Sequence, residues 1–100
     1  METLPGRAYR RLENKLCWSR YSWFGAVDVF GNFVPATSPK AVAWDILGAI
    51  DASYEHRLDK KFWWKTVREY CLENYDSYAS DVNWTMGHEA VLEVLRACRA

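Results

Sequence analysis

The sequence predicts an α+β fold: one compact domain over residues 1–100, mostly helical, with four helices packed around one short β-hairpin in the order α-ββ-α-α-α. Three observations favour this fold. The chain has 100 residues, near the commonest size of a single domain. Apolar residues make up 50% of it and charged residues 26%, which is the balance of a globular chain. Four segments repeat apolar residues at helical spacing, and a fifth holds two β-rich runs around a Gly-Asn turn.

Aromatic residues are abundant, with six Trp, six Tyr and four Phe. Each buried aromatic side chain removes about 150–250 Å² from water, which helps a short chain to offset the entropy lost on folding. Exposed aromatic side chains are common anchors of binding surfaces. The composition therefore predicts a small stable domain suited to gripping a partner, with the tryptophans either in its core or on its surface.

The first helix is expected from about Pro5 to Trp18. Apolar residues at four-residue spacing form its buried stripe: Ala8, Leu12 and Leu16. Basic residues project from its opposite side: Arg7, Arg10 and Arg11. This basic face is either a solvated surface or a docking surface for an acidic partner.

A β-hairpin is expected next, in which the runs 26–30 and 33–36 flank the turn Gly31-Asn32. In this register Phe30 faces Phe33 beside the tip, on the side away from the core. The other side of the hairpin is expected to pack on the core: Val27, Val29, Val34 and Ala36. Pro35 has no N–H to donate, so its strand should lie at the edge of the sheet.

Ser38 as N-cap and Pro39 at the first helical position predict the start of a second helix, which runs to about Ser53. This helix is apolar nearly all round and is therefore expected at the centre of the fold. Four of its residues are expected to form the centre of the core: Val42, Ile46, Leu47 and Ile50. Its small residues, which include Gly48, allow another element to approach closely.

Two more helices are expected towards the end of the chain. Asp59 is the expected cap of a helix from Lys60 to about Asn74. Thr85 is the expected cap of a last helix, from Met86 to about Arg99. Apolar spacing places these side chains inward: Trp63, Trp64, Val67, Tyr70 and Cys71 in the third helix, and Val91, Val94, Leu95 and Cys98 in the last. Residues 75–81, between the two helices, are expected to form a polar loop with two tyrosines.

No catalytic signature is present, because the serines lack a nucleophile elbow and the five glycines form no phosphate-binding loop. His88 is expected to be a packed structural residue. His56 lies near Asp51 and Asp59 in the sequence, but no second histidine accompanies it, and these charges are expected to be solvated. We therefore expect no enzymatic activity, no cofactor and no metal.

The three cysteines form no Cys-x-x-Cys pair and are interpreted as free thiols in a reducing compartment: Cys17, Cys71 and Cys98. The first residues show no signal peptide. No apolar run approaches the ~20 residues that a membrane helix needs. We expect a cytoplasmic protein that does not associate with membranes.

The net charge is zero, with 13 basic and 13 acidic residues, whereas a dedicated nucleic-acid binder usually has a basic excess. Residues 69–95 contain six acids and no Lys or Arg. Either these acids are neutralised within the fold, or they form an acidic surface that fits a basic groove of a partner protein. The predicted protein contacts are Tyr75, Asp76, Tyr78 and Asp81, together with the hairpin pair Phe30 and Phe33.

Several short motifs occur in the order Asp28-Val29-Phe30-Gly31-Asn32, Ser38-Pro39-Lys40-Ala41-Val42-Ala43-Trp44, Leu47-Gly48-Ala49, Val82-Asn83-Trp84-Thr85 and Glu89-Ala90-Val91-Leu92-Glu93-Val94-Leu95. This pattern resembles an uncharacterised family of short phage and bacterial proteins, in which a small hairpin precedes an Ala-x-x-Trp-x-x-x-Gly-Ala helix and a Trp-Asn-Asp motif comes near the end. The chain departs from the family by placing Trp84 after Asn83 and by lacking the following Asp. The resemblance covers roughly residues 18–98. It implies the fold and a phage or mobile-element setting, and carries no known activity.

Two functions remain open. The first is a small phage or mobile-element protein that inhibits or adapts a host protein complex, such as a nucleic-acid-handling defence complex, through the acidic, aromatic-rich surface. The second is a nucleic-acid or small-ligand binding module that uses the basic face of Arg7, Arg10 and Arg11 with aromatics such as Trp18 and Trp23. The sequence carries no signal for a particular oligomeric state.

Overall fold

A computed structural model of the chain describes residues 6–22 and 25–100. Within these residues it contains five α-helices, one 3-10 helix and three short strands. In chain order they are α1 (Arg7–Leu12), η1 (Lys15–Cys17), β1 (Ala26–Val27), β2 (Phe33–Val34), β3 (Ala43–Trp44), α2 (Ile46–Ser53), α3 (Arg57–Tyr75), α4 (Ala79–Thr85) and α5 (His88–Cys98). The fold is α+β and mostly helical, as the sequence predicts.

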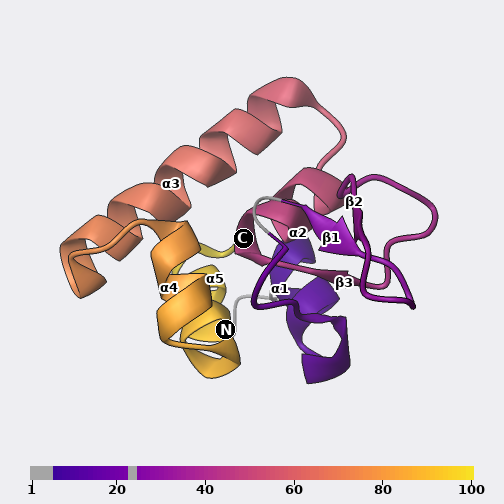
Figure 1. The fold of residues 1–100 in the computed structure, drawn as a ribbon. Helices are drawn as coiled ribbons and strands as arrows, with labels where there is room; N and C mark the ends of the chain where they lie inside the picture. The colour runs from indigo at the N-terminus through magenta and orange to yellow at the C-terminus, as the bar shows by residue number, and fades with distance from the viewer. Residues whose placement is uncertain (1–5, 23–24) are drawn as a thin grey trace.

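α2 is the central helix, with α1 and the sheet on one side of it and α3 and α4 on the other (Figure 1). The sheet is antiparallel with strand order β2-β1-β3, and β3 leads directly into α2. α5 packs against α1, α3 and α4. The fold therefore joins a sheet half and a helical half through one short helix.

The apolar side chains of α2 occupy the centre of the core, as predicted. Ile46 and Ile50 are fully buried. They belong to a cluster that draws residues from every other α-helix: Ala8, Leu12, Val67, Cys71, Ala79, Val82, Val91, Val94 and Leu95. The close approach expected at Gly48 is also present, because a Cβ there would lie 2.0 Å from the carbonyl oxygen of Gly25. The prediction is wrong for Val42, which is exposed, and Leu47 is only partly buried.

α2 begins seven residues later than the sequence predicts, which is why Val42 lies outside it. Asp45 is the actual N-cap: its buried carboxylate accepts a hydrogen bond from the Gly48 N–H at 2.6 Å. The Ser38 side chain does cap a local turn, since its hydroxyl accepts from the Lys40 N–H. Residues 43–44 then pair with β1 as a third strand. A Ser-Pro pair suits a turn as well as a helix start. Here it forms a turn, because residues 43–44 pair with β1 instead of continuing a helix.

The hairpin has a different register from the predicted one. Ala26 pairs with Val34 and Val27 with Phe33, so the connection spans residues 28–32. Asp28 causes the shift, because its carboxylate accepts hydrogen bonds from the N–H groups of residues 30 and 32, both at 2.9 Å. The predicted pair of Phe30 and Phe33 therefore does not form, and Val29 is exposed rather than in the core. The strand next to Pro35 lies at the edge of the sheet, as expected.

The first helix is shorter than predicted and ends at Leu12. The expected start at Pro5 lies outside the described residues. The Asn14 side chain accepts a hydrogen bond from the Leu16 N–H and begins η1, which turns Leu16 into solvent. Ala8 and Leu12 are buried as predicted, whereas the assignment of Leu16 to the buried stripe is wrong.

α3 starts at Arg57 rather than Lys60, because His56 caps it instead of Asp59. The Nδ1 atom of His56 accepts a hydrogen bond from the Leu58 N–H at 3.1 Å. Val67 and Cys71 are buried as expected, but Trp64 is partly exposed.

α4 was not predicted, which was the largest error in the helical half: it takes in residues 79–81 of the predicted loop and continues to Thr85. Its start follows directly on Tyr78, and Asp81 lies in its first turn. α5 begins after Gly87, whose φ of 91° favours glycine, and Thr85 is not its cap. The Thr85 hydroxyl instead donates to the Asp81 carbonyl within α4.

One buried amide connects three segments that are distant in the sequence. Asn83 of α4 is almost fully buried. Its Oδ1 atom accepts hydrogen bonds from the Ile46 N–H at 3.0 Å and from the Trp18 indole N–H at 2.8 Å. Its Nδ2 atom donates to the carbonyls of Ser19 and Arg20 at 3.1 and 3.2 Å. This amide fastens α4 to the start of α2 and to the chain that leads into the sheet.

We predict that Asn83→Ala lowers the free energy of unfolding by about 3–5 kcal/mol, because it leaves several buried donors and acceptors without partners. Chemical denaturation measures this loss. The matched control is Asn74→Ala, since Asn74 is exposed and bonds only to Tyr70 within its own helix. Equal losses in the two variants would contradict the role assigned to Asn83.

The three cysteines are free thiols, as expected. Burial raises the pKa of Cys71 to about 12 and that of Cys98 to about 11. An acid whose pKa is higher in the folded state stabilises the fold below its unfolded pKa, which for a thiol is 9.0. This contribution is lost as the pH rises towards the folded value.

The free energy of unfolding should therefore fall as the pH rises from about 9 to about 12. Cys71→Ala should make this decline shallower, because no buried thiol remains at that position to titrate. Denaturant unfolding at several alkaline pH values measures the slope, with Cys17→Ala as control. A slope that Cys71→Ala leaves unchanged would show that burial of this thiol does not govern the decline.

Candidate protein-binding surface

A groove of about 580 Å³ lies where α2, α3 and the start of α4 meet. Its lining is mostly apolar and aromatic, and Asp51 and Arg68 are its two charged side chains. The lining residues are Leu47, Asp51, Trp64, Arg68, Tyr78, Ala79 and Ser80. Leu47 and Asp51 are one turn apart on α2, and Trp64 and Arg68 are one turn apart on α3. Residues four apart project from the same side of a helix. The Leu47–Asp51 pair therefore forms one wall of the groove, and the Trp64–Arg68 pair forms another.

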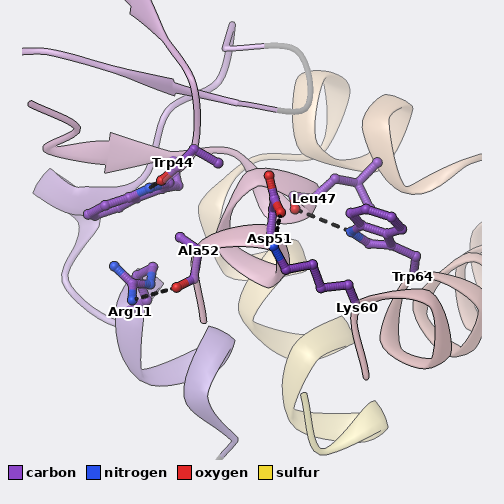
Figure 2. Close-up of polar contacts among 8 residues, drawn as sticks. Arg11, Trp44, Leu47, Asp51, Ala52, Lys60 and Trp64 are labelled. Carbon is purple, nitrogen blue, oxygen red and sulfur yellow. Dashed lines mark hydrogen bonds and ion pairs between the residues drawn. The ribbon is translucent and has the colours of Figure 1, made fainter. Parts of the chain in front are cut away.

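Two contacts join the α2 side of the groove to the α3 side (Figure 2). The Trp64 indole N–H donates to the Leu47 carbonyl at 3.4 Å. The Lys60 ammonium pairs with the Asp51 carboxylate at 2.7 Å. Trp64 was expected in the core. It lies at the margin of the buried face of α3, with 37% of its surface accessible, and lines the groove.

Tyr78 is the most exposed aromatic residue of the groove, with 54% of its surface accessible. It precedes the first residue of α4, which holds its backbone in an extended conformation. The Arg68 guanidinium lies 5.7 Å from the centre of the Tyr78 ring, a cation–π contact that orients the ring. Tyr78 therefore presents an apolar ring and a hydroxyl to solvent, as the sequence predicts.

The other predicted contacts of this segment have different environments. Asp76 is exposed and ends α3 with a φ of 52°, and Asp81 is exposed in the first turn of α4. Tyr75 is turned inward, where its ring packs 6.5 Å from that of Tyr70. Burial and a hydrogen bond to the Glu93 carboxylate raise the pKa of Tyr75 to about 12. Tyr78, Asp76 and Asp81 are thus exposed, whereas Tyr75 is partly buried and packs against the core.

The acids of residues 69–95 are all exposed: Glu69, Glu73, Asp76, Asp81, Glu89 and Glu93. None of them forms an ion pair with the residues that the structure describes, where the single pair is Lys60–Asp51. Ion pairs with other described residues therefore do not neutralise these acids. Glu69 and Glu73 belong to α3, Asp76 follows it, Asp81 belongs to α4, and Glu89 and Glu93 belong to α5.

Phe30 and Phe33 are exposed, with 85% and 68% of their surfaces accessible. They line different hollows. Phe33 borders a hollow of about 450 Å³ that shares Asp51 with the groove. Phe30 lines another hollow at the hairpin loop. Only Phe33 therefore extends the groove surface.

The basic face predicted for the first helix is divided by the fold. Arg11 points inward, where its Nε donates to the Ser53 hydroxyl at 2.9 Å. Its terminal nitrogen donates to the Ala52 carbonyl at 3.2 Å (Figure 2). Its guanidinium also lies 4.6 Å from the ring centre of Trp44. Arg7 and Arg10 are exposed, and Trp23, the aromatic proposed beside them, lies outside the described residues. Arg11 acts as a brace at the end of α2, which weakens the nucleic-acid alternative.

The histidines have structural roles. His56 caps α3, and the His88 Nε2–H donates to the Leu12 carbonyl at 2.5 Å while its ring packs 5.6 Å from that of Trp18. In the described part of the chain, no group of three His, Cys, Asp or Glu side chains could hold a metal ion. No helix among these residues is both long and apolar enough to cross a membrane.

Comparisons of the chain with protein-family models, curated proteins and solved structures find no match. The resemblance of residues 18–98 to short phage and bacterial proteins therefore stays a prediction.

Sequence reasoning found Tyr78 but missed the groove beside it. Leu47 and Trp64 were assigned to the core because apolar spacing does not separate a buried residue from one at the margin. The available signal was the position of Trp64 and Arg68, four residues apart on the border between the apolar and basic sides of α3.

Because Arg11 braces α2, Arg11→Ala should lower the free energy of unfolding by about 2–3 kcal/mol through lost charge-assisted hydrogen bonds and ring stacking. Thermal or chemical unfolding checks this value. Arg10→Ala is the matched control on the same helix and should stay within about 0.5 kcal/mol. If Arg11→Ala is as mild as the control, the brace contributes nothing to stability.

Proposed function

We propose that the chain is a binding protein rather than an enzyme, and that it docks a basic segment of a partner protein on the surface formed by Tyr78, Asp76, Asp81 and the groove. In this way it inhibits or adapts a host protein complex in the cytoplasm. The observation that carries the proposal is an exposed tyrosine in an apolar groove, flanked by acids that have no ion-pair partner among the described residues.

The groove supplies the apolar part of the interaction. Leu47, Trp64 and the Tyr78 ring line it together, so an aliphatic or aromatic side chain of the partner can be buried among them. Tyrosine and tryptophan are enriched at such centres because they bury a large area and keep a polar group for hydrogen bonding. Buried aromatic anchors contribute most of the affinity in interfaces of this kind.

The acids next to Tyr78 determine which kind of partner is selected. Asp76 and Asp81 lie two and three residues from Tyr78, and both are exposed. A Lys or Arg side chain next to the apolar anchor of the partner can pair with them. Residues 69–95 carry six exposed acids and no Lys or Arg, so this part of the chain also attracts a basic partner over longer distances.

The phage or mobile-element setting is supported by the resemblance of residues 18–98 alone. A small phage protein that inhibits a nucleic-acid-handling complex meets basic grooves built to hold phosphates, and an acidic surface with tyrosines complements such grooves. The proposal therefore favours partners that bind nucleic acid over nucleic acid itself.

Selection of peptides from a displayed random library on the immobilised protein tests this proposal. Peptides that combine Lys or Arg with a neighbouring aromatic or aliphatic residue should be enriched. For a selected peptide, Asp76→Lys/Asp81→Lys should slow association by about tenfold and flatten its salt dependence, because the steering charges are reversed. Tyr78→Ala should mainly speed dissociation.

The matched control is Glu13→Lys/Glu55→Lys, which makes the same change in net charge at two exposed acids outside this surface. It should change the association rate by less than about twofold. All of these substitutions are exposed, so the fold should survive them. Selection of acidic peptides, or equal kinetics in the two double variants, would exclude this surface.

A further inference from the structure

Among the residues that the structure describes, the outer side of α3 has no partner. It lies opposite the buried residues Val67 and Cys71, and in Figure 1 the other helices all lie on one side of α3. The residues of this side are all exposed: Arg57, Leu58, Lys61, Phe62, Lys65, Glu69, Leu72 and Glu73. We call it the outer face of α3. It mixes charges with three apolar side chains, Leu58 at 63%, Phe62 at 59% and Leu72 at 37% accessible.

The charges of the outer face are sorted along the helix. At four-residue intervals they read Arg57, Lys61, Lys65, Glu69 and Glu73. Like charges four residues apart repel one another on a helix surface, and three such neighbours occur in this row. The basic half also lies at the positive end of the helix dipole and the acidic half at the negative end. Within the described chain, none of these five residues has an ion-pair partner.

We propose that a second copy of this chain covers the outer face, with the two α3 helices antiparallel and related by a twofold axis at the level of Val67. This arrangement places Lys65 of one copy opposite Glu69 of the other, and Lys61 opposite Glu73. It also places Phe62 opposite Leu72. Each of these three contacts occurs twice, as a twofold interface requires.

The pairing removes the unfavourable features of the isolated helix. Each basic half lies beside the acidic half of the second copy, so that like-charge repulsion within a helix is offset by attraction between helices. Reversing the direction of one helix also brings its acidic half to the positive dipole end of the other. The apolar side chains Phe62 and Leu72 meet and exclude water on both sides of the central ion pairs.

A second copy fits this face better than a different partner does. A basic partner matches only Glu69 and Glu73, and an acidic partner only Lys61 and Lys65. Lys65 and Glu69 lie at equal distances from Val67 along the helix, and so do Lys61 and Glu73. Only a second copy of the same helix carries both the basic and the acidic half at this spacing. The interface does not use Tyr78, Asp76 or Asp81 for its charge pairs, so it is independent of the proposed function.

One helix face is near the small end of specific interfaces, so we expect a weak dimer with a Kd on the order of 100 μM. Sedimentation velocity between about 10 μM and about 1 mM should show a shift from monomer to dimer. Lys65→Glu and Glu69→Lys should each weaken it by at least about tenfold, because each places like charges opposite one another twice. Added salt should weaken the unchanged dimer.

The decisive samples combine the two changes. An equimolar mixture of the Lys65→Glu and Glu69→Lys chains should form a heterodimer, because opposite charges face each other again at both sites. The double variant Lys65→Glu/Glu69→Lys should form a homodimer within about threefold of the original Kd. Glu55→Lys, an exposed charge reversal outside the outer face, should leave the Kd unchanged.

The proposal is overturned if the unchanged chain stays monomeric up to 1 mM, or if the mixture and the double variant do not recover association. Circular dichroism of each variant checks that α3 remains folded. Recovery in the mixture excludes misfolding as the cause of the loss, since both chains in it carry the single changes.

Discussion

The buried amide of Asn83 is the interaction on which the arrangement of the helical half depends. It reaches from α4 to the first N–H of α2, to the Trp18 indole and to the carbonyls of residues 19 and 20. A buried amide holds its neighbours firmly only when its donors and acceptors are all satisfied, and here both ends of the amide are. Because α4 begins next to Tyr78, the same amide also positions one wall of the groove.

The tryptophans stabilise the fold through their N–H groups as well as their rings. The indole N–H of Trp18 donates to Asn83, that of Trp44 to the Ala36 carbonyl and that of Trp64 to the Leu47 carbonyl. Each bond joins segments that are distant in sequence or belong to different elements. A residue that is apolar over most of its surface and polar at one tip suits the margin of a small core. These tryptophans are therefore neither wholly core nor wholly surface.

The sequence predicted the long helices better than the short elements. α3 and α5 were placed to within a few residues, since their apolar spacing repeats over three turns or more. α4 was missed because seven residues give too little repeat, and its tyrosine-rich, polar start looks like a loop. The second helix and the hairpin were misplaced by single side chains, Asp45 and Asp28, whose hydrogen bonds to nearby N–H groups decide the local structure.

The candidate site follows the same division. Tyr78, Asp76 and Asp81 could be named from residue type, but Leu47 and Trp64 required knowledge of which elements meet. Asn83 holds α4 against the start of α2 through its hydrogen bond from the Ile46 N–H. The first N–H of a helix has no partner within its own helix. Exchange of the Ile46 amide hydrogen therefore reports directly on the bond to Asn83. Native-state hydrogen exchange should show Ile46 protected at least about 1,000-fold more than Arg57, which holds the same position in α3. Equally fast exchange of the two amides would contradict the role given to Asn83.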